Sequence, residues 1–161
     1  MSASGPAFQF LPFWEDLNRH LVELVHACPD EVLREAGPNA GWSIREIAVH
    51  IAEARHHWLT SSIRDGKASP SLHGATSAVD VGAALVESWQ RLEHFLRSPE
   101  LLAHRYAPPP GDPPYLDPAE FDGHFVAFHR LAHDIHHRAS ILDKLNERGI
   151  ELQPERLRRP L

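Results

Sequence analysis

The sequence lacks disulfide partners, long hydrophobic runs and the pattern typical of a secretory signal. Its 161 residues include one cysteine, Cys28, which fits a reducing cytoplasm and is expected to be a small buried hydrophobe rather than a nucleophile. No apolar run approaches the ~20 residues of a membrane span, so no membrane partner is expected. No charged stretch followed by an apolar one opens the chain, so we expect no secretory signal. Residues 1–161 have the length of a single domain that needs no disulfides.

An excess of positive charge is also missing. The chain has 16 Lys and Arg against 22 Asp and Glu, a formal net charge of −6 at pH 7. A nucleic-acid-binding surface needs a basic face, so no nucleic-acid partner is expected. The C-terminal RLRRPL is interpreted as a solvated charge run.

Alternating strand patterns are almost absent, and helical periodicity dominates. The pattern predicts an all-α fold with helices over residues 11–27, 43–64, 80–96 and 117–146, and indicates a short helical turn at 30–35. Ser43 and Glu46 form a capping box, and Asp117 followed by Pro118 is a second start signal. Four helices with long connections predict a four-helix bundle whose loops can cross it. The proline-rich segment 105–117 is interpreted as a stiff crossover loop rather than a polyproline ligand.

Each predicted helix carries an apolar stripe expected to face the core. In chain order these stripes are Phe13, Leu17, Leu21, Leu24 and Val25; Ile44, Ile47, Ala48, Ile51, Ala54 and Trp58; Val81, Ala84, Leu85, Trp89, Leu92 and Phe95; and Phe121, Phe125, Phe128, Ala132 and Ile135.

Histidine is what the chain has in excess, with 13 residues. Two metal ligands on one helix must lie three or four residues apart, and a third must come from a facing helix. The last helix offers the pairs His129/His133, His133/His137 and His133/His136, and spacing alone does not choose between them. The second helix offers His50 at the edge of its apolar stripe.

Two further histidines follow on the second helix. His57 lies seven residues after His50 on the same line of the helix, whereas His56 points elsewhere.

Two segments carry a family resemblance. GWSIREIAVHIAEARHHW (41–58) and AHDIHHRASILDKLNERG (132–149) resemble the DinB/YfiT-like superfamily of metal-binding helical bundles. Its members carry W-S-hydrophobic-x-E-hydrophobic-x-x-H on the second helix and H-x-x-x-H, often written H-x-x-H-H-R-G-Q-I, on the last. The resemblance implies that His50, His133 and His137 are the metal ligands.

Neighbouring positions match the same pattern with one departure. Trp42 and Ser43 fit the pair that opens the helix, His136 the extra histidine before the last ligand, and Arg138 the arginine after it. Where G-Q-I would follow, this chain has Ala139, Ser140 and Ile141. The missing glutamine implies that the pocket chemistry differs from that of relatives.

Three imidazoles leave coordination positions open on a divalent ion such as Zn, Ni, Co or Fe. The resemblance then implies two reaction classes on a small-molecule substrate. The first hypothesis is a transferase in which the metal holds the thiolate of a low-molecular-weight thiol. The second is a hydrolase using metal-bound hydroxide, with Glu53 or His57 as candidate base, although a solvated Glu53 pairing with His57 is the simpler interpretation.

A third, non-catalytic interpretation is a metal-stabilised bundle that forms a homodimer. Trp14 and Phe8 are candidate interface aromatics, and core packing is the more ordinary fate of Trp14.

Overall fold

The computed structural model describes residues 6–37, 41–107 and 121–150, with side chains from Phe10 onward, and every regular element in these ranges is helical. The α-helices are α1 (Pro6–Ala27), α2 (Asp30–Arg34), α3 (Ile44–Trp58), α4 (Ala78–Leu96), α5 (Pro99–Ala103) and α6 (Gly123–Glu147), and a π-helical turn, η2 (Leu59–Ile63), extends α3. The all-α prediction is confirmed over these residues. None of the helices in these ranges has the length and hydrophobicity to cross a membrane.

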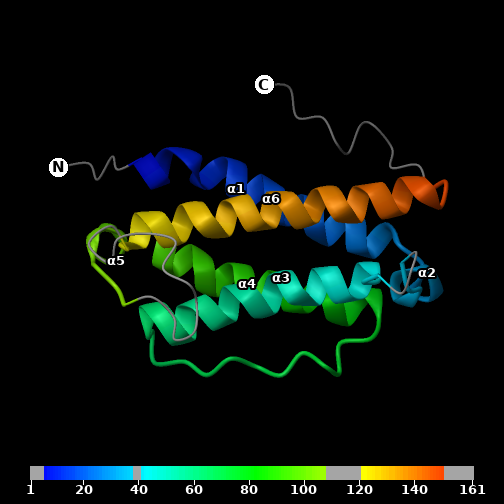
Figure 1. Cartoon of the computed structure of the whole chain (residues 1–161), viewed down its shortest axis with the longest axis horizontal. Coiled ribbons are helices and arrows are strands. Elements are labelled where there is room, and N and C mark those ends of the chain that lie inside the picture. The colour runs from blue at the N-terminus through cyan, green and yellow to red at the C-terminus, as the bar shows by residue number, and fades with distance from the viewer. Residues whose placement is uncertain (1–5, 38–40, 108–120, 151–161) are drawn as a thin grey trace.

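Four long helices lie side by side, and the short α2 and α5 lie at opposite ends of the molecule (Figure 1). Helices α1 and α6 run in one direction, and α3 and α4 run in the other. Each of α1 and α3 packs against both α4 and α6. Because α3 and α4 are parallel, the chain between them must return along the outside of the pair. The sequence predicts long loops that can cross the helices, and this connection is one.

Side-chain caps explain where α3 and α4 begin. The Ser43 hydroxyl accepts from the backbone N–H of Glu46 at 3.1 Å, and the Ser43 N–H donates to the Glu46 carboxylate at 2.7 Å. This is the predicted capping box. A second box joins Ser77 to Asp80, so α4 begins two residues before its predicted start at Asp80.

The last helix is shorter than predicted. Asp122 caps it by accepting from the Phe125 N–H at 2.9 Å, and residues 121 and 122 are not helical. The proposed start at Asp117 and residues 108–117 of the proline-rich segment lie outside the described residues.

The apolar core confirms most of the predicted stripes but corrects α1 and α6. Phe13 is 64 % exposed, and Trp14 packs inward in its place. On α6, Phe128 is 70 % and Ile135 51 % exposed, and Ala132 is exposed as well. The inward face of α6 is instead the set Gly123, Val126, Ala127, Arg130, Asp134, Ile141 and Leu145. The prediction for α6 failed because this face carries two charged side chains, so hydrophobicity did not mark it.

Two further predictions concern Cys28 and the proposed interface aromatics. Cys28 is buried as expected, and burial raises the pKa of its thiol to about 11. Trp14 is only 3 % exposed, so the interface role considered for it is wrong and core packing is confirmed. The side chain of Phe8 lies outside the described residues.

A buried ion pair joins the four long helices at the centre of the molecule. Arg55 of α3 and Asp134 of α6 are fully buried, with Nη2 and Oδ2 2.9 Å apart. Trp14 of α1 donates its indole N–H to Asp134 at 3.1 Å. Arg55 also donates to Asn18 of α1 at 2.8 Å and to Ser88 of α4 at 3.3 Å. Each charge is therefore compensated by partners from different helices.

A second arginine holds the crossing connection against α4. Arg91 of α4 donates to both carboxylate oxygens of Asp65 at 2.6 Å. It also donates to the backbone carbonyls of Lys67 at 3.0 Å and Ala68 at 3.2 Å. Because a planar guanidinium fits such a bidentate contact, Arg91 anchors the start of this long loop.

Replacing Arg55 is expected to destabilise the protein strongly. Arg55→Met leaves the Asp134 carboxylate buried without its counter-charge, so the free energy of unfolding should fall by about 3–5 kcal/mol in urea titrations. The matched control is Arg97→Met, which breaks an exposed pair with Glu93 and should cost less than about 1 kcal/mol. Equal losses in the two variants would contradict the central role of the buried pair.

Candidate metal centre

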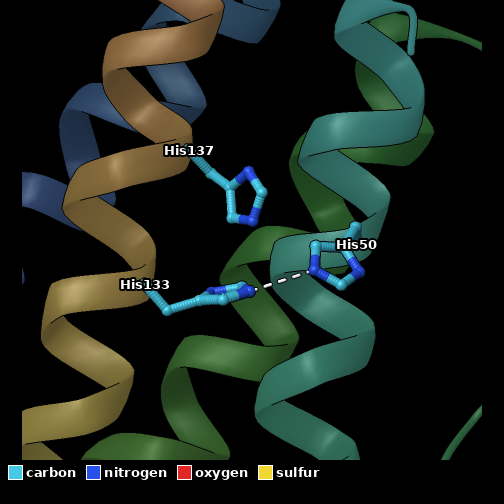
Figure 2. A group of neighbouring side chains, drawn as sticks. All are labelled: His50, His133 and His137. Atoms are coloured by element: carbon cyan, nitrogen blue, oxygen red, sulfur yellow. Dashed lines mark hydrogen bonds between the residues drawn. The ribbon is translucent and has the colours of Figure 1, made fainter. Parts of the chain in front are cut away.

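The structure brings together the three histidines that the family resemblance selected. His50 extends from α3, and His133 and His137 extend from α6 into the space between the two helices (Figure 2). One potential ligand atom from each ring lies within 4.8 Å of those of the other two. The Nε2 atoms of His133 and His50 are 3.0 Å apart.

Helix geometry accounts for this convergence. His133 and His137 are four residues apart, so they lie one above the other on the same face of α6. Helix α3 is the antiparallel neighbour of α6 and presents His50 opposite that face. All three residues are half-buried, which leaves the cluster at the edge of the core.

The donor set fits a divalent ion. With each nitrogen ~2.1 Å from an ion, neighbouring nitrogens are ~3.0 Å apart at an octahedral angle and ~3.4 Å apart at a tetrahedral angle. The 3.0 Å between His133 and His50 agrees with the octahedral value. A ligand nitrogen of His137 lies within 4.8 Å of those of the other two.

The surroundings favour neutral rings at two of the three positions. Burial, followed by the proximity of His133 and His50, lowers the pKa of His137 to about 4. Burial, followed by His133 and Arg130, also lowers the pKa of His50. A neutral imidazole has a free lone pair, which is the form that coordinates a metal.

Asp134 lies directly behind the cluster. Its Oδ1 is 3.4 Å from Nδ1 of His133. Burial acts to raise the pKa of Asp134, but the charge of Arg55 and the hydrogen bonds from His133 and Trp14 outweigh it and hold this pKa below its ordinary value. The sequence offered no signal for the role of Asp134, because nothing in the spacing separates it from a surface carboxylate next to His133.

Trp42 forms an aromatic wall on one side of the cluster. Its ring meets His50 edge-on at a centroid distance of 4.9 Å and stacks on His137 at 6.3 Å with an interplanar angle of 16°. Trp42 is 48 % exposed, so it shields the imidazoles without sealing them. The sequence predicted only that Trp42 lies at the opening of the helix. Its position directly before the cap residue Ser43, on the helix that carries His50, was the one sign that it lies near the site.

The other histidines on α6 lie outside this group. His129 packs its ring against Trp58 at 4.9 Å. His136 is exposed, with its ring 5.1 Å from that of His137. Of the pairs that spacing left open, His133/His137 is the one whose ligand atoms lie within 4.8 Å of each other and of His50.

Within the ranges that the structure describes, Glu53, His56 and His57, which follow His50 on α3, are not bonded to the three imidazoles. His57 is exposed, and His56 is buried against Arg91 at 3.0 Å, consistent with its expected orientation away from the site. Among the described residues, no hydrogen bond or ion pair joins Glu53 to His57 or either of them to the three imidazoles. The expected pairing of Glu53 with His57 is not formed.

Arg138 and Ser140, which follow the last histidine of the cluster, are hydrogen-bonded to helix residues rather than to the three imidazoles. An Nη2 atom of Arg138 lies 3.3 Å from Nδ1 of His20 on α1. The hydroxyl of Ser140 donates to the backbone carbonyl of His136 at 3.2 Å. The position of the family's glutamine thus carries a short side chain that is bonded to its own helix.

Comparison with known proteins agrees with this geometry. The model of the DinB family matches residues 1–155. The chain belongs to the DinB family. No curated protein and no solved structure matched the chain. Membership of the DinB family and the three-histidine cluster are compatible with metal binding.

The metal-free DinB protein is expected to lose stability as the pH falls. In the unfolded chain His137 takes up its proton near 6.5, and in the folded chain near 4. Between these values the unfolded state binds more protons, so the free energy of unfolding should be fully present above about 6.5 and decline toward 4. Urea titrations across this range measure the decline.

The matched variant for this titration is His137→Gln, which should show a shallower decline. The lowered pKa values of His50 and His56 act in the same direction. Stability that is constant or rises as the pH falls through this range would contradict the expectation.

Proposed function

We propose that this DinB-family protein binds one divalent metal ion through His50, His133 and His137 and uses it as an enzyme. The observation that carries the proposal is the convergence of three imidazole nitrogens, from two helices, on one point. The proposal takes the four long helices as the family's four-helix bundle and the chain as a single domain.

Three protein ligands leave positions in the coordination shell for an exchangeable group. A divalent ion held there, with Zn, Ni, Co and Fe all suited to imidazole nitrogen, supplies the Lewis acidity that lowers the pKa of a coordinated thiol or water. The chain itself supplies neutral donors and, in Trp42, an apolar wall beside two of them. The half-buried position of the cluster leaves a side from which a small molecule can approach.

Of the two reaction classes, we propose transfer of a low-molecular-weight thiol to a small electrophile. A thiolate is already a nucleophile and needs no base once its proton has left, whereas hydrolysis gains from a base beside the attacking water. Among the described residues, no hydrogen bond or ion pair joins Glu53 or His57 to the three imidazoles. This arrangement favours thiol transfer and leaves hydrolysis as the second candidate.

Metal analysis of protein purified without a histidine tag tests the ligand set. Wild type should carry a stoichiometric divalent ion, and His133→Ala should lose it because two imidazoles bind far more weakly than three. The matched control is His136→Ala, which removes an exposed histidine of the same helix and should keep the ion. Retention of the ion by His133→Ala would move the site to another pair, such as His129 with His136.

Cobalt substitution tests the thiol. The d–d spectrum of the cobalt protein should change when a small thiol is added and stay unchanged with the corresponding alcohol, since a thiol loses its proton far more readily and its soft sulfur binds the ion more tightly than a neutral hydroxyl does. A spectrum that no thiol changes, together with metal-dependent turnover of ester or amide substrates, would favour the hydrolase.

A structural role is the remaining outcome. Loss of folding in His50→Ala, together with no small molecule that shifts the melting temperature, would favour a non-catalytic, metal-stabilised homodimer.

A further inference from the structure

We propose that Asp134 is a positioning residue for the metal centre: its buried carboxylate holds His133 in the tautomer that carries its proton on Nδ1 and presents the lone pair of Nε2 to the site. The metal-binding half of this inference rests on the proposed function. The tautomer is a property of the protein without metal and can be tested separately.

The Asp134 carboxylate is held in a fixed orientation. It is fully buried, and its Oδ2 accepts hydrogen bonds from Nε of Arg55 at 3.0 Å and from the indole N–H of Trp14 at 3.1 Å. The ion-pair distance from Nη2 of Arg55 to the same oxygen is 2.9 Å. The other oxygen, Oδ1, faces Nδ1 of His133 at 3.4 Å.

This orientation decides which nitrogen of His133 carries the proton. The Arg55 guanidinium is permanently charged and pairs with Asp134, so the carboxylate is ionised and can only accept a hydrogen bond. The Nδ1 atom of His133 must therefore be the donor. A neutral imidazole has one N–H, so Nε2 of His133 is left with a free lone pair.

The contact across the two helices agrees with this assignment. Nε2 of His133 lies 3.0 Å from Nε2 of His50, and two nitrogens at this distance need one proton between them. Since His133 has its proton on the opposite nitrogen, His50 is the donor when no metal is present. His133 is thus preset for coordination, whereas His50 must move its ring proton from Nε2 to Nδ1, through solvent, before its Nε2 can coordinate.

The same contacts tie the ligand to the architecture. Asp134 receives donors from α1 and α3, so the carboxylate behind His133 is oriented by two other helices. A carboxylate on the far nitrogen of a metal-binding histidine typically contributes 10–100-fold in metal affinity by fixing ring orientation and basicity.

The first test is the tautomer itself. In metal-free wild type with 15N-labelled histidine, at mildly alkaline pH, the side-chain nitrogen shifts should show His133 protonated on Nδ1 and His50 protonated on Nε2. The spectra of His133→Gln and His50→Gln assign the signals. Protonation of His133 on Nε2 would overturn the inference.

The second test is zinc affinity, measured by competition with a chelator. Asp134→Asn should weaken zinc binding about 10–100-fold. The matched control is Asp143→Asn, which makes the same change at an exposed carboxylate of the same helix and should bind zinc as wild type does. A folded Asp134→Asn protein with wild-type zinc affinity would overturn the inference.

Folding and function are kept apart by two further measurements. If Asp134→Asn does not fold because Arg55 is left unpaired, the double variant Arg55→Met/Asp134→Asn replaces it, since it leaves no buried charge alone. The same loss of zinc affinity is expected. If wild type binds no zinc, the proposed function fails, and the tautomer measurement still decides whether Asp134 orients His133.

Discussion

The ion pair between Arg55 and Asp134 is the contact that joins the helix packing to the candidate metal centre. Both side chains are fully buried, and a charge in an apolar interior is costly unless its partners are in place. Here the partners come from all four long helices: Trp14 and Asn18 from α1, Ser88 from α4, and the pair itself from α3 and α6. A shift or rotation of one helix would leave a charge uncompensated, so the polar contacts restrict the packing more narrowly than apolar contacts alone would.

The same ion pair also affects the candidate metal centre, because its two residues lie on the helices that carry the histidines. Asp134 is the residue after His133, and Arg55 lies on the same helix as His50. The contact that sets how α3 and α6 face each other therefore also sets the distance between their histidines, 3.0 Å between Nε2 atoms. The long connection between the parallel helices α3 and α4 is anchored separately, through Arg91 and Asp65. Arg55 thus stabilises the helix packing and the site, and Arg91 stabilises the long connection.

The fold was largely predictable because helix signals are local. Ser43 and Glu46 are three residues apart, and their capping box formed as expected. The metal candidates were narrowed to a few histidines by spacing, and to His50, His133 and His137 only by family resemblance. The orientation of the last helix was not predictable in the same way. Phe128 and Ile135 look like core residues in a hydrophobicity pattern, yet they are exposed, because the inward face of α6 carries Arg130 and Asp134.

The sequence by itself determined the helical class, the main helix boundaries and the histidine excess, since periodicity, caps and composition act over a few residues. Only the tertiary structure decided which imidazoles face one another, that Trp42 packs beside them and that Asp134 lies buried behind one of them. The contacts of His133 with His50 and of His137 with Trp42 join residues more than eighty positions apart in the chain. Asp134 is buried because Arg55, 79 positions before it, compensates its charge, and the physical reason is that a buried charge needs the partners that the packed helices bring to it.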